Sequence, residues 1–140
     1  MGTTVILAAL MLGGATDLTP IVRSPRAAVE ASLAAINRHD ADALAALYSE
    51  FAEVYASDAC KPTVGPDAVR KGHEALMATM PDLSVEPTEW VVDGAHVAVL
   101  FTARSKAFPG GEMQLADFFT VRNGKIVKDV TVFNAGGPCK

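Results

Sequence analysis

The chain has 140 residues, of which 50% are hydrophobic and 20% are charged, and its formal net charge is -4. This length and composition fit one globular domain with a real core and exclude a disordered chain. The sequence lacks a basic run with interleaved aromatic residues, so it does not indicate a nucleic-acid partner, and no apolar stretch reaches the roughly 18 residues that a membrane span requires.

Residues 1–23 form either a signal peptide or a flexible N-terminal segment. The apolar run "VILAALML" has the length of a signal h-region, and "GGA" ending at Ala15 is a small-x-small cleavage pattern, although "MGTT" before it carries no positive charge. If residues 1–15 are a signal peptide, the protein is secreted or periplasmic; otherwise it is cytoplasmic. Cys60 and Cys139 match no zinc or redox spacing, and they would pair only in an exported protein.

The region from 24 to 81 predicts three helices. In the first, residues 24–40, Ser24 suits the N-cap and Pro25 the first helical position. A shorter helix is expected over 40–51 and a third over 65–81, because apolar residues recur there at helical spacing. A short strand over 52–57 and a loop over 58–65 separate these last two helices.

After residue 81 the apolar period changes from 3.6 to 2. Strands are expected over 84–92, 96–105, 114–121 and 125–133, with hairpin turns at Asp93-Gly94 and at 122–124. Helices followed by an antiparallel meander indicate the α+β class, with 24–140 as a single domain.

The strand "LADFFTV" contains an unexpected charge. Asp117 shares one strand face with Leu115, Phe119 and Val121. An ionised carboxylate in such surroundings costs several kcal/mol unless it is paired, hydrogen-bonded or neutralised. Asp117 is therefore either a functional group or a structural one that caps buried backbone or pairs with an arginine.

Three stretches, "AAINRHDADALAALYSE", "PDLSVEPTEWVVDG" and "DFFTVRNGKIVKDVTVF", resemble the SnoaL-like branch of the nuclear transport factor two-like superfamily. Ketosteroid isomerases and SnoaL-type polyketide cyclases belong to this superfamily, and the resemblance covers about 25–134. It implies a cone-shaped α+β barrel in which three N-terminal helices pack on a strongly curved antiparallel sheet around an internal hydrophobic pocket. It also implies a small apolar ligand, no cofactor, and a homodimer as the common assembly.

The resemblance places Asp117 where ketosteroid isomerases keep a neutral pocket acid that donates to an oxyanion. Asp129 is either a second catalytic candidate or an exposed aspartate near the sheet edge, and its face depends on the hairpin at 122–124. A two-residue turn pairs Arg122 with Lys125 and sets Asp129 opposite Phe118, whereas a three-residue turn sets it opposite Asp117. The family usually has the longer turn, so we expect the second register, with Val127, Asp129, Thr131 and Phe133 in the pocket.

The isomerase comparison fails at two positions. The general base of that family falls at Ala56, and Asp58, two residues on, is either a substitute for it from the loop or an ordinary loop aspartate. The oxyanion-hole tyrosine falls at Ser32, which is too short to reach the pocket.

Arg104 is expected on the pocket side, where it would neutralise a carboxylate or hold an anionic substrate; the alternative is a strand-end arginine that reaches into water. The expected substrate-binding residues are Arg104, Leu100, Thr102, Thr131, Phe133, Phe119, Val54 and Ala56. The opposite row, Val97, Val99, Phe101 and Ala103, would then form an apolar outer face that serves a dimer, with Trp90 joining it across from Val97. Alternatively this row packs on the helices and Arg104 faces solvent.

Two functions remain open from the sequence. One is a cofactor-free isomerase or cyclase that moves a proton next to a carbonyl of an apolar cyclic or polyketide-like molecule, with Asp117 as the acid/base. The other is a non-catalytic ligand-binding or dimerisation module of the same fold. His39, His73 and His96 have no carboxylate or cysteine at ligand spacing, so no metal is indicated.

Overall fold

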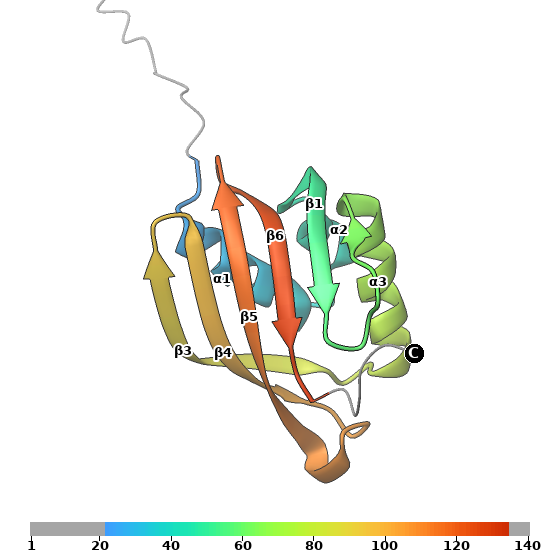
Figure 1. Ribbon diagram of the computed structural model, residues 1–140. Helices are drawn as coiled ribbons and strands as arrows, with labels where there is room; N and C mark the ends of the chain where they lie inside the picture. Colours follow the sequence, from blue (N-terminus) through green and yellow to red (C-terminus); the bar gives the residue numbers. More distant parts are fainter. Residues whose placement is uncertain (1–21, 135–140) are drawn as a thin grey trace, which may run out of the picture.

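The computed structural model describes residues 22–134 (Figure 1). The candidate signal segment and Cys139 lie outside these residues. The helices are α1 (Pro25–Asn37), α2 (Ala41–Ala45) and α3 (Pro66–Thr79), and a 3-10 turn covers Pro109–Gly111. The strands are β1 (Tyr48–Ala56), β2 (Thr63–Val64), β3 (Ser84–Asp93), β4 (His96–Arg104), β5 (Glu112–Arg122) and β6 (Lys125–Val132).

Helix α1 begins as local chemistry predicts, but it ends at Asn37, before the expected end at residue 40. The Ser24 hydroxyl accepts a hydrogen bond from the backbone N–H of Ala27 at 3.2 Å, and Pro25 occupies the first turn. The last helical residue, Asn37, exchanges two hydrogen bonds with the backbone of Val85, at 2.9 and 2.7 Å. The end of α1 is therefore tied to β3, which holds the helix against the sheet.

The second helix is shorter than its pattern predicts. It ends at Ala45, and Tyr48 already begins β1, so the expectation of a helix through residue 51 is wrong. The reason is tertiary: β1 pairs with β6, and the Ile126 N–H donates to the Leu47 carbonyl at 2.9 Å. Sheet pairing of this kind overrides a local helical preference. The expected loop over 58–65 likewise contains the short strand β2, which pairs with β1.

The sheet has six strands in the order β2-β1-β6-β5-β4-β3. All neighbours are antiparallel except β1 and β6, which run parallel. The sheet is curled and open, and the three helices lie on one of its faces (Figure 1). This arrangement confirms the predicted α+β class with three helices on a curved sheet. Within residues 22–134, no helix is both long and apolar enough to cross a membrane.

The face of β4 that touches the helices is the apolar one. Val97 and Val99 are each 1% exposed, and they pair across the sheet with Phe119 and Asp117. Directly paired side chains lie on the same face of a sheet, so the row from Val97 to Ala103 faces inward. The expectation that this row forms an outer dimer face is wrong, and the alternative that it packs on the helices holds. Trp90 does join the row, but it pairs with Val99 because the turn is Gly94-Ala95 rather than Asp93-Gly94.

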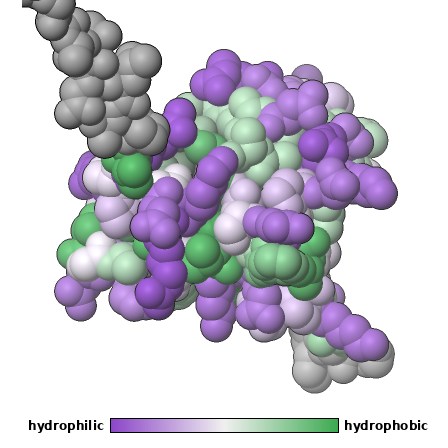
Figure 2. Space-filling model, turned by 90° about the horizontal axis from the view of Figure 1, so that it is seen from above, coloured by the Kyte–Doolittle hydropathy of each residue, from purple (hydrophilic) through white to green (hydrophobic). Residues whose placement is uncertain are grey.

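Hydrophilic side chains cover much of the end of the molecule that carries the hairpin turns, with apolar side chains showing between them (Figure 2). The core lies between the inner sheet face and the helices. Its central side chains are fully or almost fully buried: Ala28, Val29, Leu33, Ala52, Val97, Val99 and Ile126. The curled sheet therefore encloses its apolar contents on the helix side, which is the side on which Asp117 lies.

Candidate active site

The hairpin between β5 and β6 combines a tight turn with a bulge. Asn123 and Gly124 have φ values of 50° and 72°, and they join Arg122 and Lys125 in a two-residue turn. Positive φ at both central residues is the geometry that Asn-Gly favours. The expected three-residue turn is therefore wrong.

A register shift follows this turn. Val121 pairs with Ile126, but Thr120 pairs with Lys128, so one extra residue is accommodated in β6. Asp129 then lies opposite Phe119, which neither of the two predicted registers contains. The bulge nevertheless brings Asp129 to the inner face, diagonal to Asp117, while Thr131 lies directly opposite Asp117. The expectation that Asp129 shares the face of Asp117 is correct, although for a different structural reason.

Both carboxyl groups are buried and both resist ionisation. Asp117 is 6% exposed and Asp129 is 5% exposed. Burial raises the pKa of Asp117 to about 8, the negative charge of Asp129 adds to this increase, and a hydrogen bond from Thr131 opposes it. Burial also raises the pKa of Asp129 to about 7, against the lowering effect of a hydrogen bond from Tyr48. The two carboxyl groups titrate as a pair.

Tyr48 completes the polar cluster. Its hydroxyl donates a hydrogen bond of 2.7 Å to Oδ2 of Asp129, and the residue is 7% exposed. Burial, followed by the charge and hydrogen bond of Asp129, raises the pKa of Tyr48 well above its usual value, so the hydroxyl keeps its proton. Tyr48 is the first residue of β1, and it reaches Asp129 because β1 lies beside β6.

Each of the two carboxyl groups keeps one oxygen that no side chain or backbone group satisfies. Within the described residues, Oδ1 of Asp117 and Oδ1 of Asp129 are buried and lack a hydrogen-bond partner. A buried polar atom without a partner is costly, and groups of this kind concentrate where function requires them. The pair can hold one proton between its members and exchange it near neutral pH.

The sheet brings several other predicted residues to the same place. Val54 pairs with Asp129, and Ala56 pairs with Thr131. Val54, Ala56 and Thr131 are half-buried. Phe119, opposite Asp129, is buried. Phe133 follows β6, is half-buried, and donates its backbone N–H to the Ser57 hydroxyl at 3.1 Å. The carboxyl pair therefore lies between a closed apolar core and a row of partly exposed side chains.

Other predicted site residues lie elsewhere. Arg104 is 48% exposed and forms ion pairs with Glu86 at 2.7 Å and with Glu112 at 3.5 Å. Since Val99 shares the face of Asp117, the alternating residues of β4 must point to the outer face, and the expected pocket positions of Leu100, Thr102 and Arg104 are wrong.

The other two positions from the isomerase comparison are also apart from the pair. Asp58 is exposed in the loop after β1, so it does not extend the carboxyl pair. Ser32 is buried in α1, where its hydroxyl donates to the Val29 carbonyl at 2.7 Å. In residues 22–134 no group of three metal-ligating side chains is assembled.

Sequence reasoning missed Tyr48 because the helical pattern of "DADALAALYSEF" was extended too far. A period-2 signal was present, since Tyr48, Ala52, Val54 and Ala56 have the same parity and are all at least half-buried. Extending the strand pattern backwards from Ala56 would have placed the tyrosine on the inner face. The resemblance to ketosteroid isomerases implied a tyrosine in the first helix instead, at the position of Ser32.

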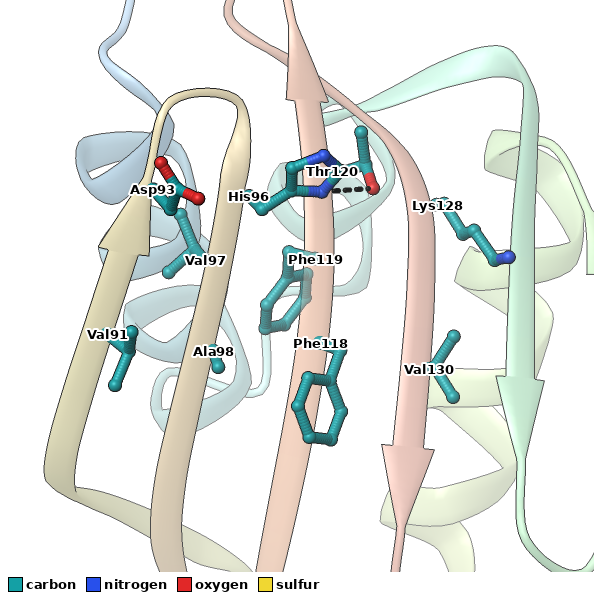
Figure 3. Close-up of a pocket in the computed structure, with 10 residues that line it drawn as sticks. All are labelled: Val91, Asp93, His96, Val97, Ala98, Phe118, Phe119, Thr120, Lys128 and Val130. Carbon is teal, nitrogen blue, oxygen red and sulfur yellow. Dashed lines mark hydrogen bonds between the residues drawn. The ribbon is translucent and has the colours of Figure 1, made fainter.

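The outer face carries a shallow hollow of about 420 Å³ (Figure 3). One row across its floor is apolar, formed by Val91, Ala98, Phe118 and Val130, which pair from strand to strand. At its upper edge Thr120 and His96 are hydrogen-bonded at 3.3 Å, and Lys128 lies beyond them (Figure 3). Neither Asp117 nor Asp129 lines this hollow, although Phe119, which lies opposite Asp129, does.

Many solved structures share this fold. A candidate polyketide cyclase from Sinorhizobium meliloti is 26% identical, with a TM-score of 0.67 over 75% of this chain and 93% of that one. IdmH from Streptomyces antibioticus, also a candidate polyketide cyclase, is 23% identical, with a TM-score of 0.68 over 79% of this chain and 91% of that one. A protein from Catenulispora acidiphila with a ketosteroid isomerase-like fold, bound to trimethylamine, is 18% identical, with a TM-score of 0.67 over 76% and 84% of the two chains.

None of the curated proteins matches the sequence significantly. The family profile of the SnoaL-like domain matches residues 29–128, which include most of α1, all of α2 and α3, and most of the sheet. Asp117 lies within the match and Asp129 lies one residue beyond it. Together with the six-stranded curled sheet, this match shows that the chain belongs to the SnoaL-like family of the nuclear transport factor two-like fold.

Proposed function

We propose that this protein is a cofactor-free enzyme that moves a proton next to the carbonyl group of an apolar cyclic or polyketide-like molecule. The observation that carries the proposal is the burial of Asp117 and Asp129 on one face, each with an oxygen that has no partner. A purely structural role would favour partners for these oxygens, because an unsatisfied buried polar atom costs about 1–3 kcal/mol.

The titration range of the pair supports acid–base chemistry. The pKa values of Asp117 and Asp129 are raised to about 8 and about 7. General acids and bases act best when their pKa lies near the working pH. At neutral pH the pair therefore offers one neutral carboxyl group, which can donate a proton, and one carboxylate, which can accept one.

The proposed reaction is a proton transfer without a change of oxidation state, and its atoms and electrons balance with the two carboxyl groups and the substrate. The carboxylate takes a proton from the carbon next to the carbonyl, and the electron pair of that C–H bond becomes a C=C bond. The carbonyl π electrons move to oxygen, which receives a hydrogen bond or the proton of the neutral carboxyl group. Return of that proton to a different carbon, as the carbonyl re-forms, completes an isomerisation. Attack of the enolate carbon on a second carbonyl, whose oxygen takes up the proton from the carboxyl group that removed it, completes a cyclisation.

The surroundings favour an apolar substrate. Val54, Phe119 and Val99 lie on the inner face beside the pair. Apolar walls with a few convergent polar groups are typical of small-molecule sites. Arg104 and Asp58 take no part in this reaction, because Arg104 lies on the outer face and Asp58 in an exposed loop.

The test is proton exchange at carbon. The full chain is incubated in D₂O with 2-tetralone and a panel of similar bicyclic ketones, and deuterium entry next to the carbonyl is followed by mass spectrometry. We expect the wild-type protein to accelerate exchange and Asp117→Asn to lower the rate by about 100-fold or more. Asp58→Asn is the matched control and keeps the wild-type rate. An Asp117→Asn protein that is as fast as wild type would overturn the assignment.

A second candidate is a non-catalytic module that pairs two copies of the chain through the outer sheet face. The observation in its favour is the apolar row under the outer hollow, in which Phe118 is 52% and Val91 is 59% exposed. Under this proposal Phe118→Lys gives a monomer in analytical ultracentrifugation while the wild-type protein is a dimer. Phe51→Lys is the control, since Phe51 is 77% exposed and lies outside the hollow.

A further inference from the structure

The two buried aspartates have different partners. Oδ2 of Asp129 accepts the Tyr48 hydroxyl at 2.7 Å, whereas Asp117 lies opposite Thr131 and receives no hydrogen bond from a tyrosine. Tyr48 is 7% exposed and Asp129 is 5% exposed, so water does not compete for this bond. The pair is therefore asymmetric before any substrate binds.

We propose that Tyr48 is a positioning residue that keeps the negative charge on Asp129 and the shared proton on Asp117. This inference rests on the proposed function and assigns the two roles that the pair alone leaves open. Asp129 is the base that takes the proton from carbon, and Asp117 is the acid that donates to the carbonyl oxygen.

The physical reason lies in the nature of the Tyr48 bond. A hydroxyl donor stabilises a carboxylate more than a neutral carboxyl group, and it thereby favours the charged form of its acceptor. Tyr48 cannot change roles near neutral pH, because its pKa is raised well above its usual value. Once Asp129 is charged, its negative charge opposes ionisation of Asp117. The proton that remains in the site is therefore held by Asp117.

The other groups around the pair do not disturb this order. On the strands beside Asp117, Val99 and Trp90 lie in its row and carry no charge. From α1, the charged side chain nearest this row is Arg26, which stacks on the Trp90 ring at 4.6 Å and pairs with exposed Glu30 at 2.8 Å. A salt-bridged arginine at the surface does not supply a counter-charge to the buried pair.

The buried histidine is also outside the cluster. Burial lowers the pKa of His73, and the charges that modify it further are those of His39, Asp40 and Glu74. Neither aspartate of the pair is among them, and no histidine is among the causes of the shifts in the pair. The order of titration therefore depends on Tyr48, Thr131 and the two carboxyl groups themselves.

The assignment restricts the substrate. The site already holds one negative charge in an apolar setting, and a second anion beside it would be strongly disfavoured. The substrate is accordingly a neutral carbonyl compound rather than a free carboxylate or a phosphate ester.

The experiment is a ¹³C NMR titration of the full chain from pH 4 to pH 10, with labelled carboxyl carbons assigned by Asp117→Asn and Asp129→Asn. In the wild-type protein we expect the carbon of Asp129 to move mainly in the lower step and that of Asp117 mainly in the upper step. Tyr48→Phe removes the donor, raises the lower apparent pKa by about 1 unit, and makes both carbons move in both steps. Tyr55→Phe, on the same strand, is the matched control and leaves the order unchanged.

Two results would overturn the inference: equal movement of both carbons in each wild-type step, or a Tyr48→Phe protein with the wild-type order. If Tyr48→Phe does not fold, the ring carbon next to the Tyr48 hydroxyl is followed in the wild-type protein, where it must shift in the lower step and not in the upper one. No substrate enters this titration. A failed ketone exchange with an ordered titration therefore rejects the proposed function alone, and a disordered titration with active exchange rejects the role of Tyr48 alone.

Discussion

A single aspartate on an apolar strand face is the most informative residue of this chain. Asp117 could be recognised from the sequence because a charge among Leu115, Phe119 and Val121 contradicts the cost of burying a carboxylate. The sequence could not show whether an arginine neutralises it, since that depends on which residues of β4 share its face. The structure places Val99 opposite it and Arg104 on the other face.

Replacement of Arg104 tests this separation. We expect Arg104→Ala to leave the apparent pKa of Asp117 unchanged in an NMR titration, because its ion pairs with Glu86 and Glu112 are on the outer face. The free energy of unfolding should change by about 1 kcal/mol or less, as for other surface ion pairs. A fall or rise of the Asp117 pKa in this variant would contradict the register of β4 and β5.

Residue burial also makes a simple stability prediction. Ile126, 0% exposed, lies at the junction of β6 with β1, so Ile126→Ala should lower the free energy of unfolding by about 2–5 kcal/mol in urea denaturation. Val132, on the same strand but 46% exposed, is the control, and Val132→Ala should cost less than about 1 kcal/mol. Equal losses would mean that the inner face of β6 is not packed as described.

At the scale of elements, the strands after residue 81 could be predicted well because their alternation and turns are local signals. β1 could not, because its first residues satisfy a helical pattern and become a strand only through pairing with β6, which is about 80 positions away in the chain. The bulge in β6 also escaped prediction. It arises from tertiary pairing on both sides of β6, and no residue type in the turn encodes it.

Replacement of two glycines by alanine should change the stability of the protein in opposite directions. Gly124 has φ 72°, and an added Cβ would lie 3.0 Å from the backbone nitrogen of Arg23, so Gly124→Ala should destabilise the protein by about 1–2 kcal/mol. Gly72 lies within α3 with nothing near an added Cβ, so Gly72→Ala should stabilise it by about 0.5–1 kcal/mol. Thermal unfolding of the two variants should shift in opposite directions, and a shift of both in one direction would contradict the turn geometry.

At the scale of the whole molecule, the buried pair links stability to pH. Aspartates in an unfolded chain titrate near pH 4, whereas the pKa values of Asp117 and Asp129 in the folded protein are about 8 and about 7. Between about pH 4 and pH 8 the folded protein binds more protons than the unfolded chain. The contribution of the pair to the free energy of unfolding is therefore fully present below about pH 4, and it is lost as the pH rises through 7 and 8. Each unit of raised pKa corresponds to about 1.4 kcal/mol.

Chemical denaturation across this range measures the effect. The free energy of unfolding should decrease from pH 5 to pH 8 in the wild-type protein, and the decrease should be smaller in Asp117→Asn, which keeps only one titrating group in the pair. Asp58→Asn is the control and should follow the wild-type curve, because Asp58 is exposed. A stability that rises over this pH range in the wild-type protein would show that the pair is ionised in the folded state.

The sequence by itself determined the α+β class, the long helices, the late antiparallel strands and the unusual position of Asp117 on an apolar strand face, because helical caps, period-2 alternation, turn residues and the cost of a buried charge are all local properties. The tertiary structure alone decided which face of β4 is inside, how Asp129 reaches the side of Asp117, and that Tyr48 joins them. These three outcomes depend on register between strands distant in sequence, and a shift of one residue moves every side chain to the other face.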